Sequence, residues 1–452
     1  MLIGLLGKTM QRKELDELFD RLWPICRSVT GPGITDSLSI LSNYIPIKIK
    51  KIPTGTKVFD WVVPQEWELK RATVETENGE MILDTESSNL HVLNFSEPFY
   101  GVLSFDDLEP NLYSDPNCPE AIPYVTSYYS PRWGLCISDK QKESLRRDIN
   151  YVVEIKTKKF DGYLRYGDCI LEGKTEETIL ITSYLCHPSL ANNELSGPLA
   201  LVSLYKKLKN LPNRKFTYRF VIAPETIGSI SFLANTPSAE LDKITGGIVL
   251  TCLGGPSQTV SFKHSRRNWV GEESSIDDFV KTITATDCED FERRDFSPRG
   301  GSDERQFCSP RINLAVIQAA RTIYGQYDEY HTSFDDKEFM TIDSVFDSVE
   351  KLFFFLKAFE LQSSSLSPTI EGGEPMLSKR NLYPSVNSSL TRQISGDDKL
   401  DGRKQLNLLL DVVSLVDGKN SVTEIVTKLN VSYKEVIPLI EKLISRGVFI
   451  CE

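Results

Sequence analysis

The stretch from residue 178 to residue 198 constrains the fold of this chain more than any other. Residues 178–183 form a short run of β-branched and apolar side chains, which predicts a buried strand. The strand must end before Pro188, because proline cannot extend a central strand. A polar turn follows at 192–197, and the apolar residues 199–208 have the length of a helix. A strand, a polar turn and a helix make half of a βαβ unit, and open α/β sheets bind their ligands where such strands end.

A histidine stands at that predicted strand end. His187 is one of only four histidines in the chain, and a single histidine is more often a satisfied loop or core residue than a ligand. Two later segments change that balance: residues 301–307 have the sequence GSDERQF, and residues 329–335 have the sequence EYHTSFD, which includes His331. We expect these segments and His187 to face one crevice, because all of them are predicted at strand ends or in loops.

Strands and helices alternate through the central part of the chain. Further strands are predicted at 216–223, 247–253 and 312–318, and further helices at 275–284 and 343–361. Alternation at these lengths predicts an α/β domain with a mostly parallel sheet covered by helices on both faces.

The chain divides into segments that differ in composition and hydrophobic pattern. Residues 48–161 contain many short alternating runs broken by Pro, Asn, Asp and Gly, which predicts a β-rich module inserted into the α/β domain. The α/β domain then comprises 1–47 and 162–362. Residues 363–389 are rich in Ser, Pro and Gly and predict a linker. Residues 390–452 show a helix, a turn, a helix and a final strand, which is the pattern of a winged helix-turn-helix.

Composition limits the function classes. The chain has 452 residues and a net charge of −11, which argues against a general affinity for nucleic acid or for an anionic membrane. No apolar run approaches the ~20 residues of a membrane span, and residues 2–6 are too short for a signal-peptide core. The nine cysteines are scattered without a CxxC pair, as expected for reduced thiols. We therefore expect a cytoplasmic protein.

Four short strings carry a resemblance to a known family. They are ANNELSG, PETIGS, GSDERQF and YHTSFD, and they occur in this order along the chain. The order resembles that of the co-catalytic zinc aminopeptidases. The strings CHPSLAN, PETIGS, SDERQF and EYHTS are more similar to bacterial aminopeptidase-like proteins found with surface-polysaccharide biosynthesis genes. The resemblance extends over nearly the whole chain and implies an aminopeptidase-like domain with an inserted β-domain and a C-terminal winged helix.

The resemblance implies a metal site and a general base. His331 matches the late ligand histidine of the family, Glu225 matches its general base, and Asp303 matches the aspartate of its SDxxxF segment. Zinc takes histidine nitrogen and carboxylate oxygen, and catalytic zinc keeps one open position. We therefore expect His187, Asp303 and His331 to bind zinc. Glu225 then lies beside the metal or acts as the base.

Several positions depart from the family pattern. Tyr184 stands nearest the position of the strand-end histidine, Asn193 replaces the bridging aspartate, Thr226 replaces the second glutamate, and Cys252 replaces the acid after the next strand. An asparagine brings no charge to neutralise two cations. The sequence therefore predicts one zinc ion, as in the related glutaminyl cyclases.

Four further residues are candidates for substrate binding. Arg132 and Trp133 follow an aromatic pair in YYSPRWG and could form a carboxylate- or sugar-binding face, or equally a turn with a buried tryptophan. Arg266 belongs to a basic cluster that is usually solvated surface, and Tyr330 precedes His331. The resemblance also implies that the loop at 27–33 helps to shape the pocket.

Three functions compete at this point. The first is a zinc-dependent amide hydrolase of aminopeptidase type, acting on a peptide-like or small-molecule substrate, in surface-polysaccharide biosynthesis if the resemblance holds. The second is a degenerate peptidase scaffold that binds a ligand without turnover, as the lost ligands suggest. The third is a winged-helix regulator with a sensor domain. Residues 390–452 have equal numbers of basic and acidic side chains, whereas a DNA-binding domain normally shows a basic surface. A protein-interaction or homo-oligomerisation role is therefore favoured for this domain.

Overall fold

The computed structural model describes residues 9–382 and 398–451. Residues 383–397, at the end of the predicted linker and the start of the predicted small domain, lie outside the described residues. Two compact units share the chain: one comprises residues 1–277 and 292–353, and the other comprises 278–291 and 354–452.

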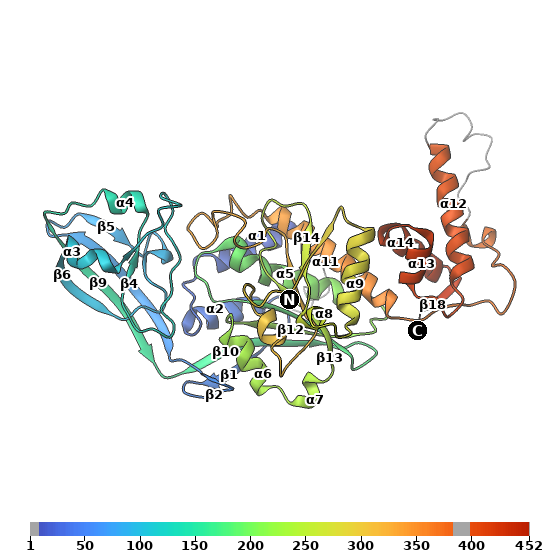
Figure 1. Ribbon diagram of the computed structural model, residues 1–452, viewed down its shortest axis with the longest axis horizontal. Helices are drawn as coiled ribbons and strands as arrows, with labels where there is room; N and C mark the ends of the chain where they lie inside the picture. Colours follow the sequence, from blue (N-terminus) through green and yellow to red (C-terminus); the bar gives the residue numbers. More distant parts are fainter. Residues whose placement is uncertain (1–8, 383–397, 452) are drawn as a thin grey trace. The chain divides into compact units, whose positions relative to one another are not determined.

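An eight-stranded sheet forms the centre of the first unit (Figure 1). Its order is β1-β10-β12-β11-β13-β16-β14-β15. The strands are β1 (Lys48–Pro53), β10 (Tyr163–Leu171), β11 (Thr178–Tyr184), β12 (Thr217–Ala223), β13 (Ile244–Leu250), β14 (Val260–Lys263), β15 (Phe291–Arg294) and β16 (Val316–Ala320).

The four central strands β12, β11, β13 and β16 run parallel, whereas β1, β10 and β14 pair antiparallel. Burial is nearly complete in three of these strands: it covers every residue of β11 and β16 and the last five residues of β13. Strands buried on both faces need continuous apolar runs, which is why TILITSY could be identified from sequence. The predicted mostly parallel α/β fold is confirmed, with antiparallel strands added at its edges.

Helices and turns connect these strands. They are α1 (Arg12–Leu22), α2 (Pro32–Leu41), α5 (Ser196–Lys209), α6 (Ile227–Asn235), α7 (Ser238–Leu241), α8 (Arg266–Trp269), α9 (Ser275–Thr286), α10 (Glu304–Phe307) and α11 (Ile342–Gln362). Twelve of the fourteen residues of α5 are buried, because this helix packs on β11, β12 and β13. Ahead of it, Ala191–Leu195 forms a short π-helical turn, a feature frequent at functional sites.

The β-rich segment forms a separate four-stranded sheet of order β5-β4-β9-β6. Its elements are β4 (Glu66–Thr76), β5 (Met81–Asp84), β6 (Phe99–Ser104) and β9 (Asn150–Phe160), with the short helices α3 (Phe105–Leu108) and α4 (Asp139–Glu143) and the strand pair β7 (Leu112–Tyr113) and β8 (Leu135–Cys136). A two-stranded hairpin of β2 (Lys57–Val58) and β3 (Trp61–Val62) precedes it. The expected β-rich character of this segment is therefore present, although β1 joins the large sheet.

Beyond α11, the described residues of the second unit form three α-helices and a small sheet (Figure 1). They are α12 (Asp398–Leu415), α13 (Val422–Leu429), α14 (Tyr433–Ser445), β17 (Leu366–Pro368) and β18 (Phe449–Cys451), and β17 pairs antiparallel with β18. Capping boxes begin both α13 and α14: Ser421 pairs with Glu424, and Ser432 pairs with Glu435. The predicted helix, turn, helix and strand are found. The strand β17 lies within the residues predicted to be linker.

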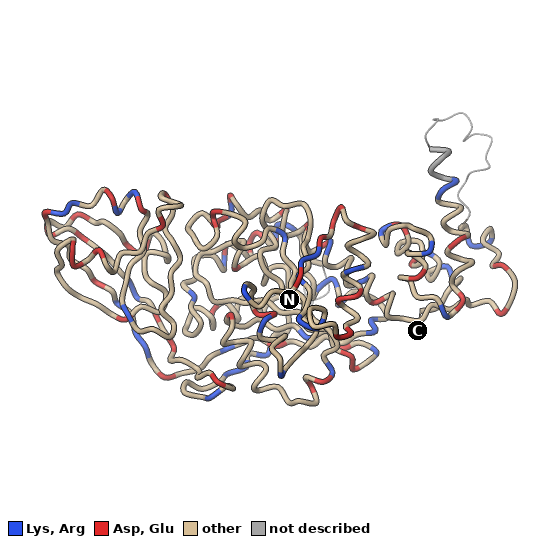
Figure 2. The backbone as a smooth tube through the Cα atoms, viewed as in Figure 1, with Lys and Arg blue, Asp and Glu red and all other residues tan. Residues whose placement is uncertain are grey.

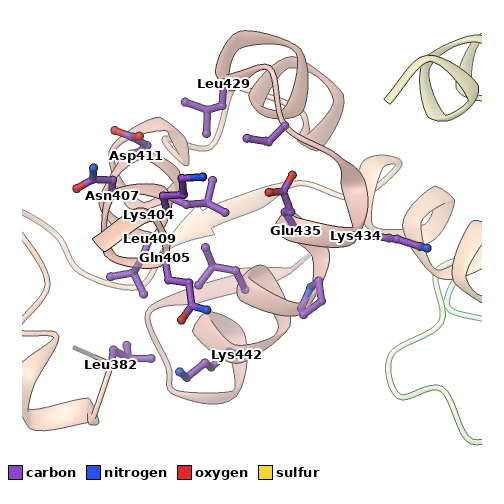
Figure 3. A pocket seen from close by; sticks show the side chains of 14 residues that line it. Leu382, Lys404, Gln405, Asn407, Leu409, Asp411, Leu429, Lys434, Glu435 and Lys442 are labelled. Atoms are coloured by element: carbon purple, nitrogen blue, oxygen red, sulfur yellow. The ribbon is translucent and has the colours of Figure 1, made fainter. Parts of the chain in front are cut away.

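Charges of both signs are mixed in this unit (Figure 2). A groove of about 830 Å³ between its helices carries Lys404, Lys434 and Lys442 beside Asp411 and Glu435 (Figure 3). The groove therefore lacks the continuous basic surface that a nucleic-acid backbone requires. Over the described residues, none of the helices has the length and apolarity needed to span a bilayer.

Candidate functional site

A cavity of about 290 Å³ lies where the central parallel strands end. Six of its lining residues follow strands of the large sheet: Cys186, His187, Glu225, Thr226, Ile227 and His331. His187 follows β11, and Glu225 follows β12, which is the neighbouring strand in the sheet. This is the edge at which open α/β sheets bind their ligands.

The two predicted histidine ligands meet in this cavity. The ring centroids of His187 and His331 lie 5.4 Å apart, although 144 residues separate them in the chain. The backbone of His331 is left-handed, with a φ of 57°. Its carbonyl oxygen accepts a 2.7 Å hydrogen bond from the amide of Tyr124, and the Tyr330 ring stacks on its imidazole at 3.9 Å. A residue other than glycine rarely has a positive φ. These two contacts hold His331 in that conformation.

A buried carboxylate orients His187. Glu194 Oε2 lies 2.7 Å from His187 Nδ1, and Glu194 Oε1 accepts a hydrogen bond from the amide of Cys186 at 2.5 Å. Arg27, fully buried, lies 3.6 Å from the same carboxylate and donates to the carbonyl of His187 at 2.9 Å. With Nδ1 held by Glu194, His187 presents Nε2 to the cavity. A carboxylate behind the imidazole is the usual arrangement for a histidine that binds a metal.

Glu225 faces His187 across the cavity. Its Oε2 lies 3.8 Å from His187 Nε2, and its Oε1 accepts a 2.6 Å hydrogen bond from the Ser302 hydroxyl. One oxygen of Glu225 is therefore held, and the other is directed towards the imidazole. Burial raises the pKa of the Glu225 carboxyl, and His187 opposes this rise. A carboxylate with a raised pKa is suited to accept and return a proton near neutral pH.

The pKa values of the two imidazoles shift in opposite directions. Burial and the neighbouring His187 lower the pKa of His331 to about 3, so its ring is neutral. Burial alone would lower the pKa of His187, but Cys186 and Glu194 raise it well above its usual range. Imidazole binds a metal through a ring nitrogen that carries no proton, so a metal ion on His187 Nε2 would take the place of a proton on that atom.

Asp303 lies beside Glu225 and supports the turn that follows β12. Its Oδ1 accepts a 2.7 Å hydrogen bond from the amide of Thr226. Thr226 needs this support, because its φ of 63° and ψ of −74° belong to a strained turn. Asp303 Oδ2 is buried, and the Ser229 hydroxyl is close enough to lower the pKa of this carboxyl. Burial and the charge of Glu225 outweigh that effect and raise the pKa of Asp303 well above its usual range.

Two of the residues that depart from the aminopeptidase pattern, Tyr184 and Asn193, bond to each other. The Tyr184 hydroxyl donates to the carbonyl of Asn193 at 2.5 Å and lies 2.6 Å from the hydroxyl of Thr251. It also lies 3.1 Å from Asn193 Oδ1. This network uses the oxygens that a second metal ion would need, and it carries no negative charge.

Within the described part of the chain, one group of metal-ligating residue types is compact enough to hold an ion by itself. The donor atoms of Cys186, His187 and Glu194 all lie within 4.8 Å of one another. Both oxygens of Glu194 are already occupied by the Cys186 amide and by His187 Nδ1. We therefore interpret this group as the support of His187 and not as a separate site.

The β-rich module supplies the opposite wall of the cavity. Its lining residues are Trp61, Tyr124, Thr126, Tyr128 and Tyr129. The module is tied to the His331 loop by hydrogen bonds in both directions between Ile122 and Ser333. The ring of Tyr124 lies 4.9 Å from that of His187 and 5.2 Å from that of His331. The module is thus part of the site.

Two phenols belong to this wall, and the ring of one of them, Tyr124, faces both imidazoles. The hydroxyls of Tyr124 and Tyr128 lie 2.6 Å apart, and either can be the donor. A pair of hydroxyls has two protons and uses only one in its mutual bond. The second proton is directed to no other described residue, so this pair can donate to a group inside the cavity.

The four predicted substrate-binding residues lie outside the lining of this cavity. Arg132 donates to the carbonyl of Thr126, Trp133 stacks on Phe99 with centroids 4.0 Å apart, and Arg266 donates to Asn313. Tyr330 contacts the site through its stacking on His331. In the string YYSPRWG it is the first two residues, Tyr128 and Tyr129, that line the cavity.

Sequence reasoning missed Glu194 and Tyr124. Glu194 carried a signal, since it replaces the asparagine of the family turn with a charged residue beside a candidate ligand. Tyr124 carried none, because nothing in its local sequence indicates a distant pairing with residue 331. The loop at 27–33 contributes Val29 to the cavity and Arg27 to the support of His187.

Comparisons with known proteins agree with this architecture. The family model described as "Domain of unknown function (DUF4910)" matches residues 16–362, and a winged helix-turn-helix model matches residues 365–451. A protein of Clostridium acetobutylicum, named as a polysaccharide biosynthesis protein with an aminopeptidase-like domain, is 37% identical over 94% of this chain and 93% of its own. The resemblance stated from the sequence motifs is confirmed.

Two solved structures show the same fold. A crystal structure from Clostridium acetobutylicum, described as a peptidase, has a TM-score of 0.82 and 34% identity and covers 98% of this chain and 96% of its own. A zinc aminopeptidase of Bacillus subtilis has a TM-score of 0.54 and 11% identity, over 76% of this chain and 94% of its own. At that identity the second likeness concerns the fold alone.

Proposed function

Because this chain belongs to the DUF4910 family, whose members include an aminopeptidase-like relative, we propose that it is a metal-dependent amide hydrolase with one zinc ion. The observation that carries the proposal is the meeting of His187 and His331, whose rings lie 5.4 Å apart in a cavity that also holds Glu225. Two imidazoles and a carboxylate are the ligands that catalytic zinc prefers.

Two imidazoles and a buried carboxylate are available to a single ion, but over the described residues their donor atoms do not all lie within 4.8 Å of one another, so binding would draw them together. His187 presents Nε2 because Glu194 holds Nδ1, and His331 is neutral. Asp303 Oδ2 is a buried carboxylate oxygen close to the Ser229 hydroxyl. We propose His187, His331 and Asp303 as the ligands. The hydrogen-bonded Tyr184 and Asn193 leave no charged ligand for a second ion.

Glu225 competes with Asp303 for the third ligand position. Its Oε2 lies 3.8 Å from His187 Nε2, which is compatible with a shared ion as well as with a water between them. We assign Glu225 to proton transfer, since Ser302 fixes one of its oxygens and burial raises its pKa. Metal content separates the two assignments: Asp303→Asn should lose zinc and Glu225→Gln should retain it.

The chain's own groups account for the proton movements of amide hydrolysis. A bound zinc ion would polarise the carbonyl and lower the pKa of a water towards ~7. Glu225 takes a proton from the attacking water and returns it to the amine that leaves. The pair formed by Tyr124 and Tyr128 keeps both of its protons and donates a hydrogen bond to the carbonyl oxygen, where negative charge develops.

The name of the Clostridium relative supports a role in surface-polysaccharide biosynthesis. We propose that the amide belongs to a peptide-like or amino-sugar precursor and that the reaction takes place in the cytoplasm. The nine cysteines are all free thiols, as a reducing compartment allows. For the winged-helix unit we propose a role in protein interaction or self-association, since its charges are balanced.

A second function is favoured by a specific observation. Tyr184, Asn193, Thr226 and Cys252 stand where the aminopeptidase pattern has metal ligands. A scaffold that binds a ligand without turnover would tolerate those losses. Hydrolysis of aminoacyl 4-nitroanilides by the purified protein with one equivalent of zinc tests the two functions. We expect turnover that Glu225→Gln abolishes; if neither protein releases nitroaniline from any member of an amino-acid panel, the scaffold function is correct.

A further inference from the structure

We propose that a second cavity beside the site binds a bulky apolar substituent of the substrate, so that the enzyme acts on amides that carry such a group. This inference rests on the proposed function, which places the amide of the substrate in the first cavity. Whether the second cavity binds an apolar group is tested separately, by binding measurements. The cavity has a volume of about 640 Å³, within the range of small-molecule sites.

The second cavity has a largely apolar wall and shares one lining residue with the first. Its apolar wall consists of Phe59, Trp61, Ile230, Leu233 and Ile312. Trp61 also lines the cavity of the two histidines, so this one side chain borders both spaces. A substrate whose amide lies between the imidazoles and Glu225 can therefore reach the second cavity by passing Trp61.

The hairpin that carries Phe59 and Trp61 has a strained backbone at its turn. Lys57 pairs with Val62 and Val58 pairs with Trp61, so Phe59 and Asp60 form a two-residue turn. Phe59 has a φ of 54° at the first turn position, where glycine is the preferred residue. A bulky aromatic with a positive φ is a genuine outlier, and such strain concentrates at ligand-binding segments.

Three aromatic residues form an exposed strip along this path. Phe59 is 53% exposed, Trp61 37% and Tyr129 52%, and the Trp61 ring meets the edge of the Tyr129 ring at 5.4 Å. Asp60 and Arg311 at the rim carry opposite charges, so the rim selects no charged ligand. An uncharged apolar group is the occupant that gains most from this surface, since its burial removes both partners from water.

Binding of two matched amides by isothermal titration calorimetry tests the proposal. N-octanoyl-alaninamide and N-acetyl-alaninamide differ only in chain length. We expect the octanoyl compound to bind with a Kd about tenfold lower or better, because each added methylene leaves water. Trp61→Ala and Phe59→Gly should each remove most of that advantage. Phe59→Gly should do so without lowering the Tm, since glycine relieves the turn. Trp269→Ala, which removes a tryptophan that is 58% exposed elsewhere, should retain the advantage.

The outcomes separate this inference from the proposed function. Equal affinities of the two amides, or an advantage that persists in Trp61→Ala and Phe59→Gly, would overturn the apolar cavity. Light scattering that finds a dimer in the wild type and a monomer in Phe59→Gly would also overturn it, because the strip would then bind a second copy. Tighter octanoyl binding by a protein that hydrolyses no amide would retain the cavity and reject the hydrolase.

Discussion

Glu194 determines what His187 can do. Its carboxylate is fully buried, lies 2.7 Å from His187 Nδ1 and is paired at 3.6 Å with the buried guanidinium of Arg27. The protein therefore stabilises one buried charge with another behind a single imidazole. Burying two charges is costly unless the groups are paired and hydrogen-bonded. The pair of Arg27 and Glu194 holds His187 in a fixed orientation, which leaves Nε2 available to bind a metal.

Glu194→Gln should weaken metal binding without removing a ligand. The amide can no longer accept from Nδ1 as strongly, and outer partners of ligand histidines typically contribute about 10–100-fold in metal affinity. We expect a fall of that size, measured by competition with a chromophoric chelator. Asp277→Asn is the matched control, because Asp277 lies 2.9 Å from Nδ1 of His264, which is outside the cavity lining. An unchanged affinity in Glu194→Gln would contradict this role.

Asp277 gives a pH-dependent prediction of its own. Burial raises the pKa of this carboxyl, but hydrogen bonds from His264, Ser265 and Ser274 outweigh burial, so the pKa is lowered from 3.8. A lowered pKa in the folded state stabilises the protein above the unfolded value, and that contribution is lost as the pH falls through the folded value. Asp277→Asn should therefore cost about 1–3 kcal/mol at pH 7.

The cost of Asp277→Asn should shrink as the pH falls below the unfolded value of 3.8 towards the lower folded pKa. Urea unfolding of both proteins at pH 7 and at a series of lower pH values measures the free energies of unfolding. The same difference at all of these pH values would show that the charge of Asp277 contributes nothing to stability.

At the scale of elements, the β-rich module acts as one wall of the site. Ile122 and Ser333 exchange hydrogen bonds, and the amide of Tyr124 bonds to the carbonyl of His331. The module thus positions the backbone of one candidate ligand and also contributes the phenol pair. An inserted module without a role in the site would need neither the hydrogen bond to the His331 backbone nor the phenol pair.

Tyr124→Phe combined with Tyr128→Phe should lower kcat with little effect on zinc content. Loss of a donor to the developing oxyanion typically costs about 10²–10³-fold in kcat, and the backbone bond of Tyr124 is unaffected. Steady-state kinetics and metal analysis of the same sample provide the measurement. Tyr151→Phe, which removes a hydroxyl bonded to the Arg146 carbonyl, is the control. A double variant with full kcat would exclude the phenols from the reaction.

The elements that sequence predicted best are those whose pattern is set by burial. The strand at Thr178–Tyr184 lies within one residue of the expected bounds, and the helices Val422–Leu429 and Tyr433–Ser445 follow the expected order of helix, turn and helix. Their apolar periodicity and capping residues are local signals. Contacts such as Tyr124 with His331 depend on pairing across 207 positions, which leaves no local pattern. The meeting of His187 and His331 could be expected, because both were predicted at the ends of strands in one sheet. The wall that the β-rich module forms opposite them could not, because no local pattern indicates its pairing with the His331 loop.

At the scale of the whole molecule, the winged-helix unit should bind duplex DNA only weakly. Residues 390–452 have equal numbers of basic and acidic side chains, and phosphate contacts need a cluster of cations. Fluorescence anisotropy with random duplexes at 50 and 200 mM salt should give a Kd no tighter than about 10⁻⁵ M, with a shallow salt dependence. Submicromolar binding that falls steeply with salt would support the regulator function instead.

The account depends on one ion shared by two imidazoles that lie far apart in the chain. Inductively coupled plasma mass spectrometry of the purified full-length protein measures this most directly. We expect about one zinc per chain in the wild type. His331→Ala should retain only a trace, whereas His264→Ala, which removes a histidine outside the cavity lining, should retain the full equivalent. A wild type without metal after zinc loading, or a His331→Ala variant with unchanged zinc, would contradict the account.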